Sequence, residues 1–513
     1  MKKIYRLLYS NKFVAMVMLL MQIITFVAMY IWISDYSKVL FGLSTVLSAV
    51  LIIFEINRTE ESTFKMTWIT LIAIIPIFGA LFYLFTRAQG VSMNIGDDYK
   101  NIQEANKKYL VQDNDVMKNI YQTDKNQDGF ARYLSKYGGS PAYTNTGVHY
   151  YCIGERMSEE MKKELLKAEK FIFLEFFIIN HTSHMWNEIL EILKKKVKQG
   201  VEVRVMYDGM GCIVTLPRKY NEYLERQGIK CRIFSPIVPL LSTHQNNRDH
   251  RKIMVIDGAV AFCGGINISD EYINEKQRFG YWKDNGVRIT GKAVYSMTQM
   301  FLQMWNAFAL EKDKLDYEKF CLEDVRPLAK EERGIVLPYS DHPLDSEFVG
   351  ESVYINLINS AQKYIYFFTP YLIIDNEVVT ALILAAKRGV DVRIITPGIP
   401  DKKMIFLVTQ SYYPQLVEGG VQIFQYRPGF VHAKCAVCDD KIATVGTINL
   451  DYRSLYLHFE NGLFLYNNDT VMDIKKDILD TLEDCNRIMP EMCKKNMFFL
   501  LLQGILRIFA PLL

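Results

Sequence analysis

The sequence predicts an α/β fold in which two similar halves follow an N-terminal series of apolar helices. Three observations support this prediction. From about residue 146 onward, helical and strand-like patterns alternate, as they do in layered α/β domains. The same succession of patterns occurs a second time, and long uncharged stretches fill much of the first 90 residues. With 513 residues, the chain has room for two or three domains with separate cores.

The apolar region 1–90 predicts a membrane anchor. Residues 13–34 and 66–86 are uncharged, and each stretch is long enough to cross a bilayer. Pro76 predicts a kink in the second stretch. Residues 39–56 form a shorter apolar stretch and give a third expected crossing. A cleaved signal peptide is the alternative for the first stretch, but the apolar core is too long and no small-residue cleavage site follows it.

The sequence carries conflicting signals about the side of the membrane on which the two halves lie. The basic residues Lys2, Lys3 and Arg6 favour a cytoplasmic N-terminus, and three crossings would then place the halves outside. The nine cysteines are scattered and show no pairing pattern, which suits a reducing compartment. We expect the cytoplasmic side. The 60 basic and 57 acidic residues nearly balance, which disfavours nucleic acid as a partner.

Residues 91–140 are polar and predict a connector to the first half, which we place at 141–310. Within this half, charged residues at helical spacing predict a helix, and apolar runs predict buried strands. The expected order is a helix at 158–170, a strand at 171–179, a helix at 186–199 and a strand at 200–209.

The second half, expected at 346–490 after a linker at 311–345, repeats this order. The stretch "KYIYFFTPYLI" (363–373) matches "KFIFLEFFIIN" (170–180), and "KRGVDVRIITPG" matches "KQGVEVRVMYDG". The chain is therefore expected to contain a duplicated α/β unit.

A short motif occurs once in each half. "RDHRKIMVIDG" (248–258) contains His250, Lys252 and Asp257, and "FVHAKCAVCDD" (430–440) contains His432, Lys434 and Asp439 in the same spacing, 182 residues later. Asn267 and Asn449 follow the respective histidines by 17 residues. Four identities at fixed spacing are not expected by chance.

The residue types of this motif suit chemistry on a phosphate group. A histidine and a lysine two residues apart share one face of a strand. The lysine and asparagine side chains can hold phosphate oxygens, while the imidazole attacks phosphorus or carries a proton. Two imidazoles on opposite sides of one phosphorus would support a double displacement without a metal. Asp257 and Asp439 belong to the motif, but the better prediction for both is a turn that they brace by hydrogen bonds.

Two further features of the motif region have alternative interpretations. Zinc could be bound by His432, Cys435 and Cys438 with His250, but the first half lacks a matching cysteine pair, so we expect no metal. A histidine often needs a carboxylate to fix its tautomer. The candidates are Asp284 and Glu460, each before an apolar run, although both could equally be solvent-facing acids.

The paired motifs resemble those of the phospholipase D superfamily. The longer strings "NRDHRKIMVIDG", "GGINISDEY", "GFVHAKCAVCDD" and "VGTINLDYRSLYLHFENG" resemble bacterial cardiolipin synthases of that type. The resemblance extends from the second apolar stretch to the C-terminus. It implies two phospholipase D-like α/β sandwich domains with the active site at their interface, preceded by transmembrane helices in a bacterial cell membrane.

The resemblance also implies a reaction and roles for the motif residues. Two phosphatidylglycerol molecules would give cardiolipin and glycerol without a cofactor, with membrane lipid as partner and a homo-oligomer left open. His250 would be the nucleophile and His432 the general acid and base. Lys252, Lys434, Asn267 and Asn449 would hold the phosphate. Asp284 and Glu460 would orient the histidines, and we expect Asp284 to serve His250.

Other functions remain open at this point. A lipid hydrolase would use the same residues with water as acceptor. A nuclease or an inactive membrane scaffold is a weaker alternative. The C-terminal stretch 497–513 contains Gln503 and Arg507, which predicts a helix lying on the bilayer surface, with packing in the protein core as the alternative.

Overall fold

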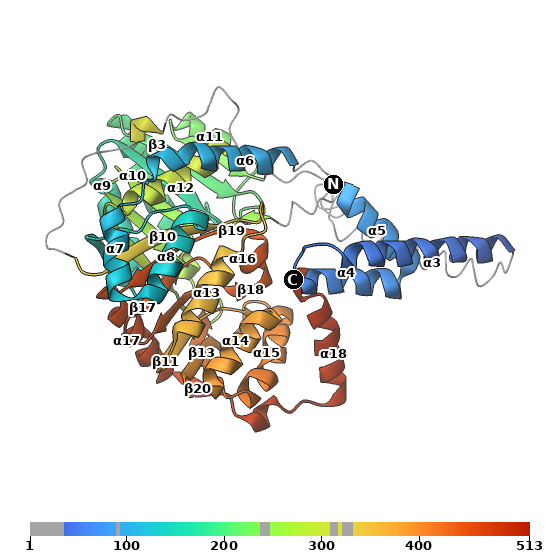
Figure 1. Ribbon diagram of the computed structural model, residues 1–513. Coiled ribbons are helices and arrows are strands. Elements are labelled where there is room, and N and C mark those ends of the chain that lie inside the picture. Colours follow the sequence, from blue (N-terminus) through green and yellow to red (C-terminus); the bar gives the residue numbers. More distant parts are fainter. Residues whose placement is uncertain (1–34, 89–92, 236–246, 308–316, 321–331, 513) are drawn as a thin grey trace. The chain divides into compact units, whose positions relative to one another are not determined.

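The computed structural model describes residues 35–88, 93–235, 247–307, 317–320 and 332–512 (Figure 1). The chain divides into two compact units. One comprises residues 1–94, 237–247 and 504–513, and the other comprises residues 95–236 and 248–503. The crossing expected at 13–34 lies outside the described residues.

The described part of the first unit includes the helices α3 (Asp35–Ile56), α4 (Ser62–Ile74) and α5 (Pro76–Ala88). The ring of Trp68 in α4 lies 5.4 Å from that of Tyr83 in α5, so these two helices fold back on each other. The Tyr83 hydroxyl donates a hydrogen bond of 2.6 Å to the buried Glu55 of α3. A core of Leu51, Trp68, Ile72, Ala80 and Tyr83 joins the three helices.

The stretch 66–86, which we expected to be one span with a kink at Pro76, is divided there into two separate helices. Pro76 lacks the backbone N–H that would continue the hydrogen-bond ladder, and α4 ends just before it. A Cβ on Gly79 would lie 2.5 Å from the Leu71 carbonyl oxygen, so glycine lets the chain fold back closely here. Among the described residues, none of the helices combines the length and the apolar character needed to cross a membrane.

The first half of the second unit is built on a mixed sheet. Its strand order is β1-β9-β7-β6-β2-β3-β4. Strands β2, β3 and β4 are parallel, and the remaining neighbours are antiparallel. The bounds are β1 (Thr146–Tyr151), β2 (Phe171–Phe176), β3 (Glu202–Asp208), β4 (Lys230–Phe234), β6 (Lys252–Ile256), β7 (Val260–Gly264) and β9 (Gly286–Gly291).

The second half repeats this sheet, with strand order β10-β19-β17-β16-β11-β13-β14-β20. Apart from β20, each strand has a counterpart at the same place in the first sheet. This confirms the duplication expected from sequence. The bounds are β10 (Ile335–Asp341), β11 (Tyr364–Phe368), β13 (Asp391–Pro397), β14 (Gln422–Tyr426), β16 (Cys435–Cys438), β17 (Ile442–Gly446), β19 (His458–Tyr466) and β20 (Cys485–Arg487).

One face of each sheet packs against the central hydrophobic core, which lies between the two sheets. Alternate residues of β2 separate the two faces, since Phe171 and Phe173 join the central core whereas Ile172 and Leu174 join an outer one. Helices α12 (Val294–Ala307) and α17 (Thr470–Leu482) contact strands of both sheets.

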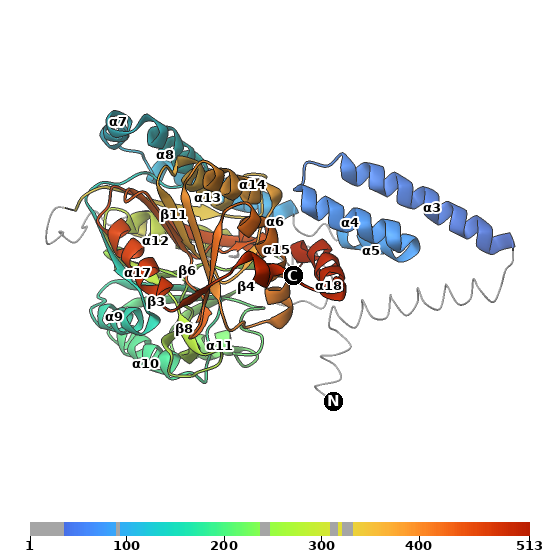
Figure 2. The same ribbon diagram turned by 90° about the horizontal axis from the view of Figure 1, so that it is seen from below.

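Two sets of helices cover the outer faces (Figure 2). The first sheet carries α9 (Gly154–Leu166), α10 (His184–Lys198) and α11 (Tyr220–Arg226). The second sheet carries α13 (Val349–Ser360), α14 (Asn376–Lys387) and α15 (Lys403–Glu418).

Two of the expected connecting segments contain regular structure. The polar stretch 91–140 is largely helical, with α6 (Met93–Asn106), α7 (Asn114–Thr123) and α8 (Lys125–Tyr137), because its polar residues belong to amphipathic helices. The stretch 311–345 contains β10, which pairs with β19 throughout its length. The second half therefore begins before residue 346.

The C-terminal helix α18 (Met497–Ile508) exposes most of its apolar side chains. Gln503 is buried and donates a hydrogen bond of 3.1 Å to the Leu407 carbonyl. Met497, Phe498 and Leu501 are 82 %, 71 % and 63 % exposed. These side chains lie outside the core, which contradicts the core-packing alternative for them.

The two halves exchange short strands. Strand β5 (Arg248–Asp249) of the first half pairs with β19 of the second. Strand β15 (Gly429–Val431) of the second half pairs with β8 (Tyr281–Lys283) of the first. Each exchanged strand runs directly into one of the repeated motifs.

Candidate active site

The strand exchange fixes the backbone of both motif histidines. The His250 N–H donates a hydrogen bond of 2.9 Å to the carbonyl of Phe459, in the other half. The His432 N–H likewise donates a hydrogen bond of 2.7 Å to the carbonyl of Lys283. Both histidines thus stand where the halves meet, each anchored to the opposite one.

Each imidazole pairs with a carboxylate from the opposite half. Nδ1 of His250 lies 2.8 Å from Oε1 of Glu460, and Nδ1 of His432 lies 2.7 Å from Oδ2 of Asp284. The expectation that Asp284 serves His250 is therefore wrong. That expectation placed the carboxylate in the same half as its histidine. The exchanged strands instead place each motif histidine beside a carboxylate of the other half.

These pairs determine the chemistry of each imidazole. A carboxylate accepts the proton on Nδ1, which leaves Nε2 with a free lone pair in the neutral ring. Burial and the neighbouring Lys252 lower the pKa of His250 well below its usual value. Burial and Lys434 lower the pKa of His432 to about 4, against the opposing effect of Asp284. Without a bound anion, both rings therefore favour the neutral form near pH 7.

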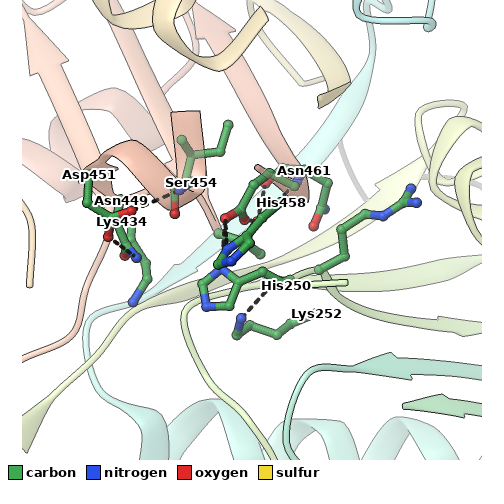
Figure 3. A network of polar contacts seen from close by, with 12 residues as sticks. His250, Lys252, Lys434, Asn449, Asp451, Ser454, His458 and Asn461 are labelled. Atoms are coloured by element: carbon green, nitrogen blue, oxygen red, sulfur yellow. Dashed lines mark hydrogen bonds and ion pairs between the residues drawn. The ribbon is translucent and has the colours of Figure 1, made fainter. Parts of the chain in front are cut away.

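Two ammonium groups accompany the two imidazoles, and Figure 3 shows Lys252 beside His250. Nζ of Lys252 donates a hydrogen bond of 2.6 Å to the His250 carbonyl, and Nζ of Lys434 donates one to the His432 carbonyl. Burial lowers the pKa of Lys252 to about 8 and that of Lys434 to about 7. Buried cations of this kind favour an anionic ligand.

The two asparagines are held by their own halves. Oδ1 of Asn267 accepts a hydrogen bond of 3.0 Å from the Ile178 N–H, and its Nδ2 donates to the Tyr272 hydroxyl. Nδ2 of Asn449 donates a hydrogen bond of 2.9 Å to Asp451. Each Nδ2 carries a second hydrogen, which can form a hydrogen bond to a phosphate oxygen.

Asp257 and Asp439 brace turns at the far ends of strands β6 and β16 from the histidines. The Asp257 carboxylate accepts hydrogen bonds of 2.7 to 2.9 Å from three consecutive backbone N–H groups, 169–171. Asp439 does the same with the N–H groups of 362–364. Their φ angles, 55° and 51°, are left-handed. The turn role expected for both is confirmed.

The sequence comparisons agree with this geometry. The family model described as cardiolipin synthase, PLD-like domain, matches residues 161–305 and 354–481, more than half of the chain. The chain belongs to the cardiolipin synthase family. It is accordingly a phospholipase D-type phosphatidyltransferase, as the resemblance implied. A second model, the phospholipase D-nuclease N-terminal domain, matches residues 45–87.

Similar proteins cover nearly the whole chain. Cardiolipin synthase of Alkalihalophilus pseudofirmus is 33 % identical over 95 % of this chain and 97 % of its own length. That of Listeria monocytogenes is 31 % identical over 93 % and 99 %. An uncharacterized protein of Streptococcus mutans is 47 % identical over 90 % and 99 %.

A solved structure shares the fold. The crystal structure of phosphatidylserine synthase from Haemophilus influenzae superposes with a TM-score of 0.58 at 16 % identity, over 76 % of this chain and 98 % of that one. At this identity the likeness concerns the duplicated α/β fold alone.

Sequence reasoning missed two residues of this cardiolipin synthase family site. Trp282 and His458 each precede an orienting carboxylate by two positions, and on a strand such residues share its face. Nε1 of Trp282 lies 3.3 Å from Oδ2 of Asp284. Nδ1 of His458 lies 3.7 Å from Oε1 of Glu460. The matching spacing before the two carboxylates could have revealed both.

Among the described residues, His250, His458 and Glu460 form a group whose ligand atoms lie within 4.8 Å of one another. The hydrogen bond between His250 and Glu460 already occupies two of these atoms, and Lys252 and Lys434 add positive charge. The group therefore favours an anion over a metal cation. The alternative zinc ligands Cys435 and Cys438 lie on strand β16 and are free thiols.

Proposed function

We propose that this phosphatidyltransferase condenses two phosphatidylglycerol molecules to cardiolipin and glycerol through a phosphohistidine intermediate. The observation that carries the proposal is the crossed pairing of His250 with Glu460 and of His432 with Asp284. It gives one site two imidazoles, each fixed by a carboxylate at Nδ1 and each presenting Nε2 to the phosphate. A double displacement at phosphorus needs both.

In the first step, Nε2 of His250 attacks the phosphorus of one phosphatidylglycerol. A P–N bond forms, the P–O bond to the headgroup glycerol breaks, and His432 gives its Nε2 proton to the departing oxygen. His432 takes up this proton from solvent when the anionic phosphate group binds, and Asp284 stabilises the resulting imidazolium. Glycerol leaves, and the phosphatidyl group stays on His250.

In the second step, a headgroup hydroxyl of another phosphatidylglycerol attacks the same phosphorus. His432, now neutral, takes the hydroxyl proton, the P–N bond breaks, and cardiolipin leaves. His250 returns to its neutral state and His432 returns to its protonated one. Every bond and proton is restored, so the cycle needs no cofactor.

The surroundings of the two rings support His250 as the nucleophile. A nucleophilic imidazole must be neutral, whereas a general acid must hold a proton before the leaving group departs. The pKa of His250 is lowered by burial and by Lys252, Lys434, His432 and Lys402. In His432, the charge and the hydrogen bond of Asp284 oppose the lowering of the pKa. His432 is thus the better proton carrier.

The side chains of Lys252 and Lys434, with the second Nδ2 hydrogens of Asn267 and Asn449, would hold the non-bridging phosphate oxygens. Charge-assisted hydrogen bonds of this kind strengthen as negative charge develops in the transition state.

The same proposal includes a membrane-bound state. Apolar side chains are exposed along α3, among them Leu43, Val50 and Ile53, and the phospholipase D-nuclease N-terminal model matches this region. Large exposed apolar surfaces mark membrane or partner contacts, and the substrate is a lipid. We keep the cytoplasmic side as the expected location of the site.

Radiolabelled phosphatidylglycerol in mixed micelles tests the reaction. We expect the purified protein to form labelled cardiolipin and an equal amount of glycerol. Phosphatidic acid as the sole lipid product would replace the proposed function with hydrolysis. Unchanged substrate, with the same micelles active for a cardiolipin synthase control, would favour a scaffold.

A rapid acid-free quench tests the intermediate. The phosphatidyl label should be recovered on the peptide containing His250 and should vanish in His250→Ala. Recovery on the peptide containing His432 would reverse the two roles. Turnover near the wild-type rate in either alanine variant would overturn the two-histidine mechanism.

A further inference from the structure

The two halves of the site carry different rings at one equivalent position. The ring centroid of Trp282 lies 5.2 Å from that of His432, at an interplanar angle of 47°. The centroid of His458 lies 5.5 Å from that of His250, at 44°. Each ring thus stands beside a motif histidine in nearly the same geometry.

Trp282 and His458 also lie near a carboxylate, but only Trp282 forms a hydrogen bond with it. Nε1 of Trp282 donates to the Asp284 oxygen that accepts the His432 proton. Nδ1 of His458 lies 3.7 Å from the Glu460 oxygen that accepts the His250 proton. His458 is 9 % exposed, and among the described residues neither of its ring nitrogens has a hydrogen-bond partner.

Since a buried N–H without a partner is destabilising, a turn of the His458 ring that brings Nδ1 onto Glu460 is favoured. The other oxygen of Glu460 already accepts a hydrogen bond from the Thr447 hydroxyl. A donor from His458 would therefore complete the hydrogen bonding of Glu460, as Trp282 does for Asp284.

We propose that His458 is a positioning residue for the reaction of this family, donating from Nδ1 to Glu460 and thereby keeping His250 neutral and nucleophilic. The proposal rests on the function proposed above. A hydrogen bond to Glu460 offsets part of its negative charge. Since that charge favours the imidazolium form of His250, the donor lowers the pH below which His250 becomes protonated.

The donor must come from neutral His458. Burial lowers the pKa of His458 to about 3, so near pH 7 the ring carries one proton. The charged or titratable groups that act on the two rings are Glu460 on β19, Arg453 on α16 (Tyr452–Tyr456), Lys252 on β6, and Lys434, His432 and Lys402.

The test compares three substitutions in the full-length protein. His458→Asn places an amide nitrogen near the position of Nδ1 and retains the donor. His458→Gln places it near Nε2 and removes the donor with little loss of volume, and His458→Leu removes all polarity. Release of glycerol from phosphatidylglycerol micelles is followed from pH 4 to 9, and thermal melting confirms folding.

We expect His458→Gln and His458→Leu to move the acid limb of kcat upward by about one pH unit. At a pH on the acid limb itself, their kcat should fall about tenfold, with KM unchanged. His458→Asn should stay within about twofold of the wild type and keep its acid limb. Trp282→Phe, the matched change in the other half, should lower kcat without moving that limb.

Three results would overturn the proposal: an unmoved acid limb in both donor-free variants, a loss in His458→Asn equal to that in His458→Gln, or an equal shift in Trp282→Phe. Glycerol release counts transfer to lipid and transfer to water alike. If the protein transfers the phosphatidyl group to water, phosphatidylglycerol is not the acceptor and the proposed function fails. The low-pH limbs of kcat can still be compared among the variants, so the role of His458 is tested separately.

Discussion

Nδ1 of His250 lies 2.8 Å from Oε1 of Glu460, although 210 positions separate them along the chain. The second pair, His432 with Asp284, spans 148 positions and crosses between the halves in the opposite direction. A change in either carboxylate therefore acts on the imidazole of the other half.

Glu460→Gln should lower kcat by about 10²–10⁴-fold with KM changed less than threefold, because an amide favours the wrong tautomer of its histidine partner. Asp284→Asn should do the same through His432. Steady-state glycerol release at saturating phosphatidylglycerol gives both constants. The pairing itself is checked by combination: Glu460→Gln should add little to the loss in His250→Gln. If the two losses multiply, the residues act independently.

Asp257→Asn should lower stability and leave the chemistry intact. It weakens the hydrogen bonds that the Asp257 carboxylate accepts from 169–171, at a cost of about 1–3 kcal/mol. Thermal melting should show a decrease of a few degrees, with kcat of the folded protein within twofold of the wild type. Asp439→Asn is the matched change in the other half. A hundredfold loss of kcat without a change in melting would contradict the turn role.

The affinity for phosphatidylglycerol should weaken as the pH rises. An ammonium is charged below its pKa, and burial lowers the pKa of Lys434 to about 7 and that of Lys252 to about 8. Between pH 7 and 9 both therefore lose the charge that holds the phosphate, and KM should rise by about tenfold or more. Lys434→Arg stays charged throughout this range and should flatten the rise. A KM that is constant from pH 6 to 9 in the wild type would exclude this role of the lysines.

The exposed apolar side chains of α18 should matter only on a bilayer. Burial of a Phe or Leu side chain contributes about 1.5–3 kcal/mol, so Phe498→Ser with Leu501→Ser should lower activity on phosphatidylglycerol vesicles about tenfold or more. Activity in detergent micelles should stay within twofold. Gln503, buried on the same helix, offers a control, since Gln503→Ala should lower the melting temperature instead. Equal losses in vesicles and micelles would count against an interfacial helix.

Much of the second unit could be predicted from sequence because its signals are local. The repeated motifs and the alternation in 200–209 predicted the duplicated sheets, and the aspartate before the turn predicted its brace. The pairing of His250 could not be predicted this way. It depends on two-residue strands such as β5, which carry no periodicity and are defined only by their partners across the halves.

In the N-terminal region, the sequence predicted the apolar segments but not how they fold. The apolar stretch 66–86 predicted one span with a kink at Pro76. The chain instead folds back there between α4 and α5, which depends on the close approach at Gly79. The repeat was recognised from residues that are identical in the two halves. His458 and Trp282 occupy equivalent positions but are different residues, so the repeat did not reveal them.

The exchanged strands also limit how such a protein can have arisen. A single half would hold an imidazole without its carboxylate, so it could act only with a second copy of itself, each copy completing the other's histidine. Fusion of two such copies into one chain would free them from that symmetry. A tryptophan could then stand at one position and a histidine at its equivalent, and the two sides of one reaction could specialise.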